Sequence, residues 1–318
     1  MNGFMPEKQG HNARTIFDII ILGGGPAGLT AALYGGRADC KVLVLEPALP
    51  GGEIASSAWL DNYPGFHEGI GGMEFGQLLA QHADRFGSET IAARVEKADL
   101  TGSPKKVVAS GKEYLARTVI MATGTLPRSL GAAGEEEFKG RGISYCATCD
   151  APFFKNKDTM VVGGGDSALE EAFYLSRFAR SVTIVHRRQQ FRAVKKLWER
   201  GKKDPKINFL LDTVVKEFKG NQALEKVLLE NVKTNQQQLV EVNGAFIYVG
   251  RLPNTGFVDE LEKDGQGYLI TNETMETSLP GVFAAGDVRR KFLRQVVTAA
   301  ADGAIAATMA IKYLDEVL

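Results

Sequence analysis

Two cysteines, Cys146 and Cys149, stand three residues apart in the run Cys-Ala-Thr-Cys-Asp. This spacing is typical of dithiol redox motifs, because both sulfurs then lie on one side of a turn and the start of a helix favours a thiolate. Asp150 follows directly, where a carboxyl could move a proton when the dithiol opens or closes, or could cap the next turn. The pair therefore predicts redox chemistry.

The cysteine pair has two other interpretations, half of a zinc site or two inert core thiols. Zinc would need further ligands, but the remaining cysteine, Cys40, approaches an apolar strand, and the four histidines show no ligand spacing. We therefore expect no metal site and expect Cys40 to be packed in the core. Three cysteines also do not make the disulfide framework of a small secreted protein.

A glycine motif, Gly23-x-Gly25-x-x-Gly28, stands between an apolar run over 16–22 and an Ala- and Leu-containing segment over 27–37. Glycines at these positions allow a tight strand–helix turn and a close approach of backbone to a pyrophosphate, which the start of the helix attracts. Any tight strand–helix turn selects glycine, so the motif alone is a weak signal. Its strand and helix context favours dinucleotide binding.

A second motif of the same kind, Gly163-x-Gly165-x-x-Ala168, occurs 140 residues later. It again follows an apolar run, over 158–162, and opens a helix pattern over 167–178. This offset is too long for a solenoid repeat. It indicates two nucleotide-binding domains of similar build.

The two motifs differ in the charge that follows them. Glu46 stands 18 residues after Gly28, at the end of the next strand, where an acid accepts hydrogen bonds from ribose hydroxyls. The corresponding segment of the second motif is basic: His186, Arg187, Arg188 and Arg192. Arginines there would hold a 2′-phosphate, although a solvated basic surface is the alternative. The contrast favours FAD for the first motif and NADPH for the second, hence hydride transfer to a flavin.

The order of the patterns predicts an α/β protein with two Rossmann-like three-layer nucleotide-binding domains, the second inserted into the first. A strand pattern followed by a proline occurs over 118–127 and again over 245–253, and these are the expected junctions. The predicted FAD-binding domain comprises 1–125, with an N-terminal extension over 1–15, and 253–318. The predicted NADPH-binding domain, which carries the cysteine pair, is 126–252.

Composition excludes other classes of function. The 38 Lys and Arg residues balance 38 Asp and Glu residues, which argues against binding to nucleic acid or to an anionic membrane. The longest early uncharged stretch, 19–36, has Gly-Gly-Gly-Pro in its middle, so it is a poor membrane helix. The first residues lack an apolar signal core. We expect a soluble cytoplasmic protein.

Several motifs together resemble the low-molecular-weight bacterial thioredoxin reductases, over nearly the whole chain from Ile16 to Leu318. They are Cys146–Asp150, Gly163-Gly-Gly-Asp-Ser-Ala-Leu-Glu-Glu, His186-Arg-Arg with Arg192, Gly23-Gly-Gly-Pro-Ala-Gly, Asn62-Tyr-Pro-Gly, Gly286-Asp287 and Arg294-Gln295-Val296. The resemblance implies a homodimer whose NADPH domain rotates. Electrons would pass from NADPH through FAD to the Cys146–Cys149 disulfide and then to thioredoxin or a similar small dithiol protein.

The resemblance and the glycine motifs together give a set of expected site residues. Those expected at FAD are Gly23, Gly25, Pro26, Ala27, Gly28, Glu46, Gly52, Glu53, Asn62, Gly124, Gly286, Asp287, Arg294, Gln295 and Val296. Those expected at NADPH are Gly163, Gly165, Asp166, Ser167, Ala168, His186, Arg187, Arg188 and Arg192. By the resemblance, Cys149 corresponds to the sulfur that faces the flavin and Cys146 to the sulfur that attacks thioredoxin. Asp150 joins them as a catalytic candidate because of its position directly after the dithiol.

The chain departs from the family pattern in three places. Glu53 replaces the common Gln beside the flavin, Ala151 replaces the usual Gly after Asp150, and the N-terminal extension has no counterpart. Two alternatives to thioredoxin reduction stay open. The acceptor could be a glutaredoxin-like protein or a peroxidase partner, or the protein could be a flavin redox sensor that does not turn over.

Overall fold

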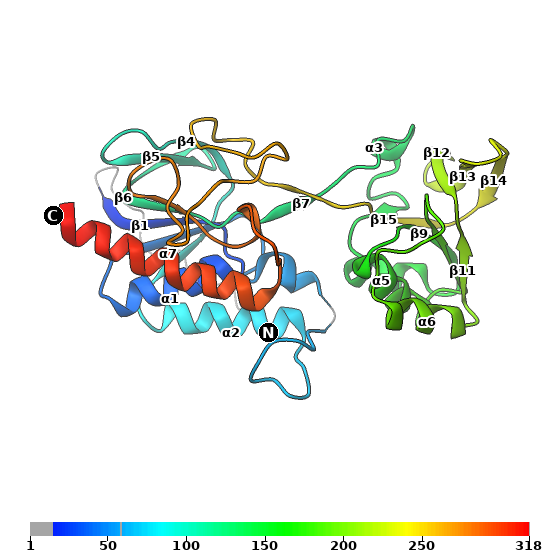
Figure 1. Ribbon diagram of the computed structural model, residues 1–318, viewed down its shortest axis with the longest axis horizontal. Helices are drawn as coiled ribbons and strands as arrows, with labels where there is room; N and C mark the ends of the chain where they lie inside the picture. Colours follow the sequence, from blue (N-terminus) through cyan, green and yellow to red (C-terminus); the bar gives the residue numbers. More distant parts are fainter. Residues whose placement is uncertain (1–14, 58, 318) are drawn as a thin grey trace. The chain divides into compact units, whose positions relative to one another are not determined.

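The computed structural model describes residues 15–57 and 59–317. The chain divides into two compact units, drawn in Figure 1. The interrupted unit runs to Thr125 and resumes at Leu252, and the inserted unit is Leu126–Arg251. The two passages between them, β7 (Thr125–Pro127) and β16 (Arg251–Pro253), pair as a two-stranded ribbon. The predicted α/β fold with one nucleotide-binding domain inserted in another is confirmed.

The interrupted unit is built on a seven-stranded sheet. Its strands are β1 (Ile16–Leu22), β2 (Val42–Glu46), β3 (Glu89–Ala92), β4 (Val95–Asp99), β5 (Lys105–Ala109), β6 (Lys112–Met121) and β17 (Val282–Ala284). The order is β3-β2-β1-β6-β5-β4, with β17 also paired to β6. Strands β3, β2, β1, β6 and β17 are parallel, whereas β4 and β5 join antiparallel. Parallel pairing requires the crossover helix that the glycine motif predicts.

Both faces of this sheet are buried, which is why β1 reads as a nearly continuous apolar run. Ile19 and Ile21 point to a layer made by α1 (Pro26–Arg37) and α7 (Val296–Val317), which lie side by side in Figure 1. Ile20 and Leu22 point to the opposite core, with residues of β5. Burial of each such side chain contributes about 1.5–3 kcal/mol. Helix α2 (Gly72–Asp84) and the short η1 (Gly52–Ser56) and η3 (Gly286–Val288) complete the unit.

The inserted unit has a five-stranded parallel sheet in the order β11-β10-β9-β15-β8. Its strands are β8 (Ile143–Ser144), β9 (Asp158–Gly163), β10 (Ser181–Val185), β11 (Ile207–Leu210) and β15 (Gly244–Tyr248). A separate antiparallel sheet is formed by β12 (Thr213–Gly220), β13 (Leu224–Asn231) and β14 (Gln237–Glu241).

Three layers pack in the inserted unit. Helices α4 (Ala147–Asp150) and α5 (Asp166–Ser176) lie on one face of the parallel sheet, with η2 (Ala151–Phe154) and α6 (Lys195–Lys203). The antiparallel sheet and α3 (Glu135–Phe138) cover the other face. Each unit thus buries its own core, which is consistent with a domain inserted between two strands of another.

Most predicted elements occur within two residues of their expected ends. The strand expected within 118–127 begins earlier, at Lys112, and ends at Met121; Gly124 adopts a positive φ of 61° that a strand does not use. Among the described residues, no helix is both long enough and apolar enough to cross a membrane.

Two phenylalanines of the inserted unit test this packing. Phe246 is fully buried and meets Phe154 edge-to-face at 5.3 Å, whereas Phe153 is 72% exposed. We expect Phe246→Ala to lower the free energy of unfolding by about 3–5 kcal/mol, because it leaves a cavity. The control Phe153→Ala is expected to change it by about 0.5 kcal/mol or less. Urea denaturation measures both, and equal losses would contradict this core.

Candidate active site

The two cysteines of the motif form a disulfide, with their Cα atoms 5.4 Å apart. Cys146 is the residue before α4 and Cys149 lies within that helix. The backbone N–H of Cys149 donates to Sγ of Cys146 at 3.2 Å. A donor aimed at this sulfur would stabilise negative charge on it once the disulfide opens. The geometry is that of a redox-active pair, and Cys146 is the sulfur that the helix start supports.

Hydrogen bonds hold the backbone on both sides of Cys146. Ser144 Oγ accepts from the Cys146 amide at 3.0 Å, and the Ala147 amide donates to the Tyr248 hydroxyl at 2.8 Å. Asp150 occupies the N-cap position of η2, but its side chain makes no capping hydrogen bond there. Asp150 is a half-buried residue that directly follows Cys149 in the chain, and it does not serve as that cap.

Cys40 belongs to the interrupted unit, where it is half-buried against the layer of α1 and α7. Burial, followed by the charge of Asp18, raises the pKa of its thiol. A thiol that resists ionisation is a poor nucleophile, which agrees with the expected packing role.

The first glycine motif forms a tight loop between β1 and α1. A Cβ on Gly28 would lie 1.9 Å from the carbonyl oxygen of Gly23, so the start of the helix touches the end of the strand. A Cβ on Gly25 would meet nothing nearer than the Gly51 oxygen at 3.8 Å. There is space beside Gly25 that the protein leaves open, as a loop that receives a ligand's pyrophosphate requires.

Glu46, expected to face a ribose, is 7% exposed at the end of β2. Its Oε2 accepts from the Gly24 amide at 2.7 Å and its Oε1 from the Ala48 amide at 3.0 Å. The carboxylate therefore holds the glycine loop in place. Each oxygen retains a further lone pair that a hydroxyl could use.

Several other residues expected at the first site converge on this loop. The Gly51 amide donates to the Gly24 carbonyl at 2.8 Å, which brings Gly52 beside Gly25. Gly286 faces Ala27, because a Cβ on Gly286 would lie 2.9 Å from that of Ala27. Asp287 follows in η3.

The remaining residues of the first set lie around this centre. Asn62 Nδ2 donates to Gln295 Oε1 at 2.9 Å, joining two segments that are 233 residues apart, and Val296 begins α7. Gly124 accepts from the Asn254 amide at 3.0 Å. Glu53 is exposed on η1.

Two charged residues add to the first site. Asp302, which the sequence reasoning missed, is 7% exposed on α7, and its Oδ2 accepts from the Gly286 amide at 3.0 Å and from Lys291 Nζ at 2.7 Å. The one available signal was an acid in an alanine-rich helix. Arg294 places its guanidinium 4.0 Å from the Tyr268 ring, and among described residues its buried Nε has no hydrogen-bond partner.

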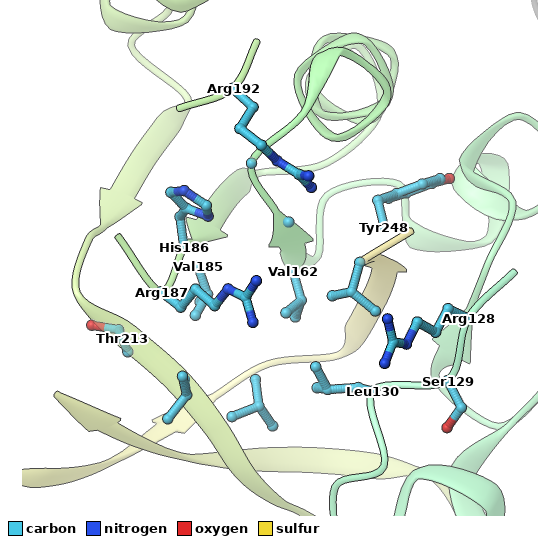
Figure 2. Close-up of a pocket in the computed structure, with 15 residues that line it drawn as sticks. Arg128, Ser129, Leu130, Val162, Val185, His186, Arg187, Arg192, Thr213 and Tyr248 are labelled. Carbon is cyan, nitrogen blue, oxygen red and sulfur yellow. The ribbon is translucent and has the colours of Figure 1, made fainter. Parts of the chain in front are cut away.

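The second glycine motif opens onto a pocket of about 220 Å³, entirely within the inserted unit (Figure 2). It brings together Gly163, His186, Arg187 and Arg192 of the expected set. Arg128 and Arg187 point their guanidinium groups into it from opposite sides. The Arg192 amide also donates to the Gly164 carbonyl at 2.8 Å, which ties the basic segment to the glycine loop.

Positive charge in this pocket comes from arginine. His186 Nε2 lies 3.1 Å from the Gln190 carbonyl oxygen, which can only accept, so this nitrogen carries the proton. Burial lowers the pKa of His186, and the nearby arginines lower it further. A neutral ring therefore packs over Gly164, and the positive charge at the pocket is that of the guanidinium groups.

Other residues expected at the second site do not line the pocket. Arg188 is exposed, and Asp166 Oδ1 accepts from the Val194 amide at 2.8 Å. Ala168 is buried against Gly163, the packing role of the third position in such motifs. Ser167 is exposed, and a Cβ on Gly165 would meet no atom within 4 Å. That open space repeats what is seen at Gly25.

The pocket includes residues that the sequence reasoning did not select: Arg128, Ser129, Thr213 and Tyr248. Arg128 directly follows Pro127, the last residue of an expected domain junction. An arginine at a domain junction was the signal that could have identified it.

Known proteins are similar to this chain in sequence and in fold. Residues 17–303 match the pyridine nucleotide-disulphide oxidoreductase family. The chain is 47% identical to a thioredoxin reductase of Listeria innocua, over 95% of each protein, and 44% identical to one of Peptoclostridium acidaminophilum, over 94% of this chain and 98% of that protein. The crystal structure of Lactococcus lactis thioredoxin reductase is similar with a TM-score of 0.91 at 44% identity, over 95% of this chain and 100% of that one.

The first glycine loop gives a matched pair of substitutions. We expect Gly28→Ala to destabilise the protein by about 3 kcal/mol or more, because its Cβ would collide with backbone that cannot move freely. In the cofactor-free protein, Gly25→Ala is expected to cost about 0.5 kcal/mol or less, since its Cβ has space there and Gly25 has a φ of −76°. Thermal and urea denaturation check both. A stable Gly28→Ala protein would refute the close approach.

Proposed function

The chain belongs to the pyridine nucleotide-disulphide oxidoreductase family, and on that premise we propose that it is a thioredoxin reductase that uses FAD and NADPH. The observation that carries the proposal is a Cys-x-x-Cys disulfide in the same unit as an arginine-lined pocket. When bound, the nicotinamide supplies a hydride and the flavin passes the electron pair to the disulfide.

The interrupted unit is the proposed FAD site. The open space beside Gly25 fits a pyrophosphate, and the first turn of α1 presents backbone amides to it. The buried Nε of Arg294 is a donor that a ligand can satisfy. Glu46 would accept hydrogen bonds from ribose hydroxyls. The turn at Gly286 and Asp287, which Asp302 holds, would bind the ribityl and pyrophosphate groups of FAD.

The inserted unit is the proposed NADPH site. The space beside Gly165 fits the second pyrophosphate, and Arg187 and Arg192 are placed to bind a 2′-phosphate. Arg128 adds a third cation on the opposite wall. A carboxylate at this position would repel that phosphate, so the arginines favour NADPH over NADH.

The cysteines would carry out thiol–disulfide exchange. The Cys146–Cys149 disulfide takes up two electrons and two protons and becomes two thiols. Cys146, as thiolate, attacks the disulfide of thioredoxin and forms a mixed disulfide, and Cys149 then attacks the Cys146 sulfur and releases reduced thioredoxin. The Cys149 amide supports the charge on Cys146, and Asp150 is placed to exchange protons with the pair.

Homodimer formation, domain rotation and a cytoplasmic location belong to the proposal and rest on the family resemblance. Light scattering of the purified protein measures its molecular mass in solution and so tests homodimer formation. An acceptor screen with thioredoxin, a glutaredoxin-like protein and a peroxidase partner distinguishes the substrate classes. A redox sensor would consume NADPH negligibly with all three.

Single cysteine variants test the roles of the two sulfurs. We expect Cys146→Ser to abolish thioredoxin reduction while NADPH still bleaches the flavin absorbance, because the attacking sulfur is lost and the cofactor sites are intact. Cys149→Ser is the matched control. It is also expected to be inactive, but Cys146 should then accumulate a stable mixed disulfide with thioredoxin, visible by mass spectrometry. Trapping by Cys146→Ser and not by Cys149→Ser would reverse the assignment.

Arginine variants test the electron donor. Replacing both Arg187 and Arg188 by Ala is expected to raise the KM for NADPH about 10- to 100-fold, since only Arg187 of the two lines the pocket and one charge-assisted hydrogen bond contributes about 1.5–3 kcal/mol. The KM for NADH should change about threefold or less. Lys196→Ala, an exposed cation on α6, is the control and should leave both values unchanged. Equal effects on NADPH and NADH would refute the 2′-phosphate site.

A further inference from the structure

Cys146 lies between two residues whose hydrogen bonds lead to the wall of the arginine-lined pocket. Tyr145 precedes it and Ala147 follows it. Tyr145 makes a hydrogen bond to Glu135, which holds a lining segment in place. Ala147 makes one to Tyr248, which lines the pocket itself. All of these residues belong to the inserted unit. The disulfide and the pocket are therefore linked by two short paths.

The first path runs through a buried carboxylate. Tyr145 donates its hydroxyl to Glu135 Oε1 at 2.6 Å, and Glu135 is only 2% exposed. The same carboxylate accepts from Ser129 Oγ and from the Leu130 amide, each at 2.8 Å, and from the Gly131 amide at 2.6 Å. Ser129 and Leu130 line the pocket. The Glu135 carboxylate thus fixes both the Tyr145 side chain and the part of the pocket wall made by Ser129 and Leu130.

Glu135 and Tyr145 keep a defined protonation. Burial by itself would raise the pKa of Glu135, but the hydrogen bonds that it accepts outweigh burial and lower it. Burial and then the bond to Glu135 raise the pKa of Tyr145. The pair therefore remains a phenol that donates to a carboxylate at neutral pH, so the path does not change with small changes of pH.

The second path is a single hydrogen bond. The hydroxyl of Tyr248 accepts from the Ala147 amide at 2.8 Å, and Ala147 is fully buried, so water does not replace this partner. Tyr248 stands at the end of β15 and lines the pocket, with its hydroxyl pointing away from the pocket interior (Figure 2). The side chain thus touches the pocket on one side and the start of α4 on the other.

We propose that Tyr145 and Tyr248 are positioning residues that couple binding of a phosphorylated nucleotide in the pocket to the redox state of Cys146–Cys149. This rests on the proposed function, which places NADPH there. Reduction adds two electrons and two protons, breaks the bond between the sulfurs and lets Cys146 move. Residues 145 and 147 move with it, so Ser129, Leu130 and Tyr248 must adjust. A ligand that contacts these walls then has different affinities for the two states, and the coupling is reciprocal.

The test measures the disulfide equilibrium. Wild-type holoenzyme is equilibrated in buffers of oxidised and reduced dithiothreitol, with and without saturating 2′,5′-ADP, which has the 2′-phosphate but no nicotinamide and transfers no hydride. Thiols are trapped with a maleimide, and the peptide that contains both cysteines is quantified by mass spectrometry. We expect the ligand to change the equilibrium constant at least threefold, which is about 14 mV for a two-electron couple.

Hydroxyl deletions identify the path. Tyr248→Phe is expected to reduce this change, and the double variant Tyr145→Phe, Tyr248→Phe to remove it. Calorimetry should give a 2′,5′-ADP affinity within about threefold of wild type in the oxidised protein, because the Tyr248 hydroxyl points away from the pocket interior and Tyr145 does not line the pocket. Tyr174→Phe, which removes a hydroxyl on α5 outside the pocket and the cysteine motif, is the control and should keep the full change. A merely structural role would not move the ligand-dependent equilibrium.

Three results would overturn the coupling. The first is a wild-type change that persists unaltered in the double variant. The second is bound 2′,5′-ADP with no change in the wild-type equilibrium, which refutes the coupling and leaves the nucleotide site standing. The third is failure of 2′,5′-ADP to bind the wild type, which refutes the nucleotide site as well. If the double variant does not fold, as judged by circular dichroism, Tyr248→Phe alone decides, since it leaves the Glu135 network complete.

Discussion

In each unit a helix starts in direct contact with the end of a parallel strand, and both proposed nucleotide sites depend on this close approach. In the interrupted unit the contact is between Gly28 and the carbonyl of Gly23, and no side chain fits. In the inserted unit the helix residue at this contact is Ala168, which has a methyl group. The strand residue that it meets is Gly163, where a Cβ would lie 2.9 Å from that methyl group. Only with the helix this close can its first amides reach a phosphate group. The middle glycines, Gly25 and Gly165, then leave the space that the ligand would occupy.

Charge separates the two sites although the whole chain is neutral. In the interrupted unit Glu46 uses both oxygens to hold the glycine loop, which would put a carboxylate beside the ribose in the proposed FAD site. In the inserted unit Arg187, Arg192 and Arg128 surround the pocket, and the low pKa of His186 leaves the positive charge to them. A 2′-phosphate would be repelled in the proposed FAD site and held in the proposed NADPH site, so the proposed assignment of the two nucleotides rests on local placement of charge.

Buried carboxylates perform the same structural task in both units. Asp302 fixes the turn at Gly286 through a backbone amide and the ammonium of Lys291. Glu135 accepts hydrogen bonds from the Leu130 amide, in the pocket wall, and from the Tyr145 hydroxyl. A buried carboxylate is costly unless every acceptor position is used, so these groups hold several segments at once. The segments they hold are those that the proposed cofactors and the disulfide require.

The sequence by itself determined the alternation of strands and helices, the two glycine loops, the cysteine pair and the difference between Glu46 and Arg187. These features are local, because each depends on residues a few positions apart or on one strand–helix–strand repeat. Only the tertiary structure decided the roles of Arg128, Tyr248, Glu135 and Asp302. Tyr248 meets Ala147 across 101 residues, and Asp302 reaches Gly286 from a different element. No spacing rule predicts such pairs, because packing of the layers brings them together.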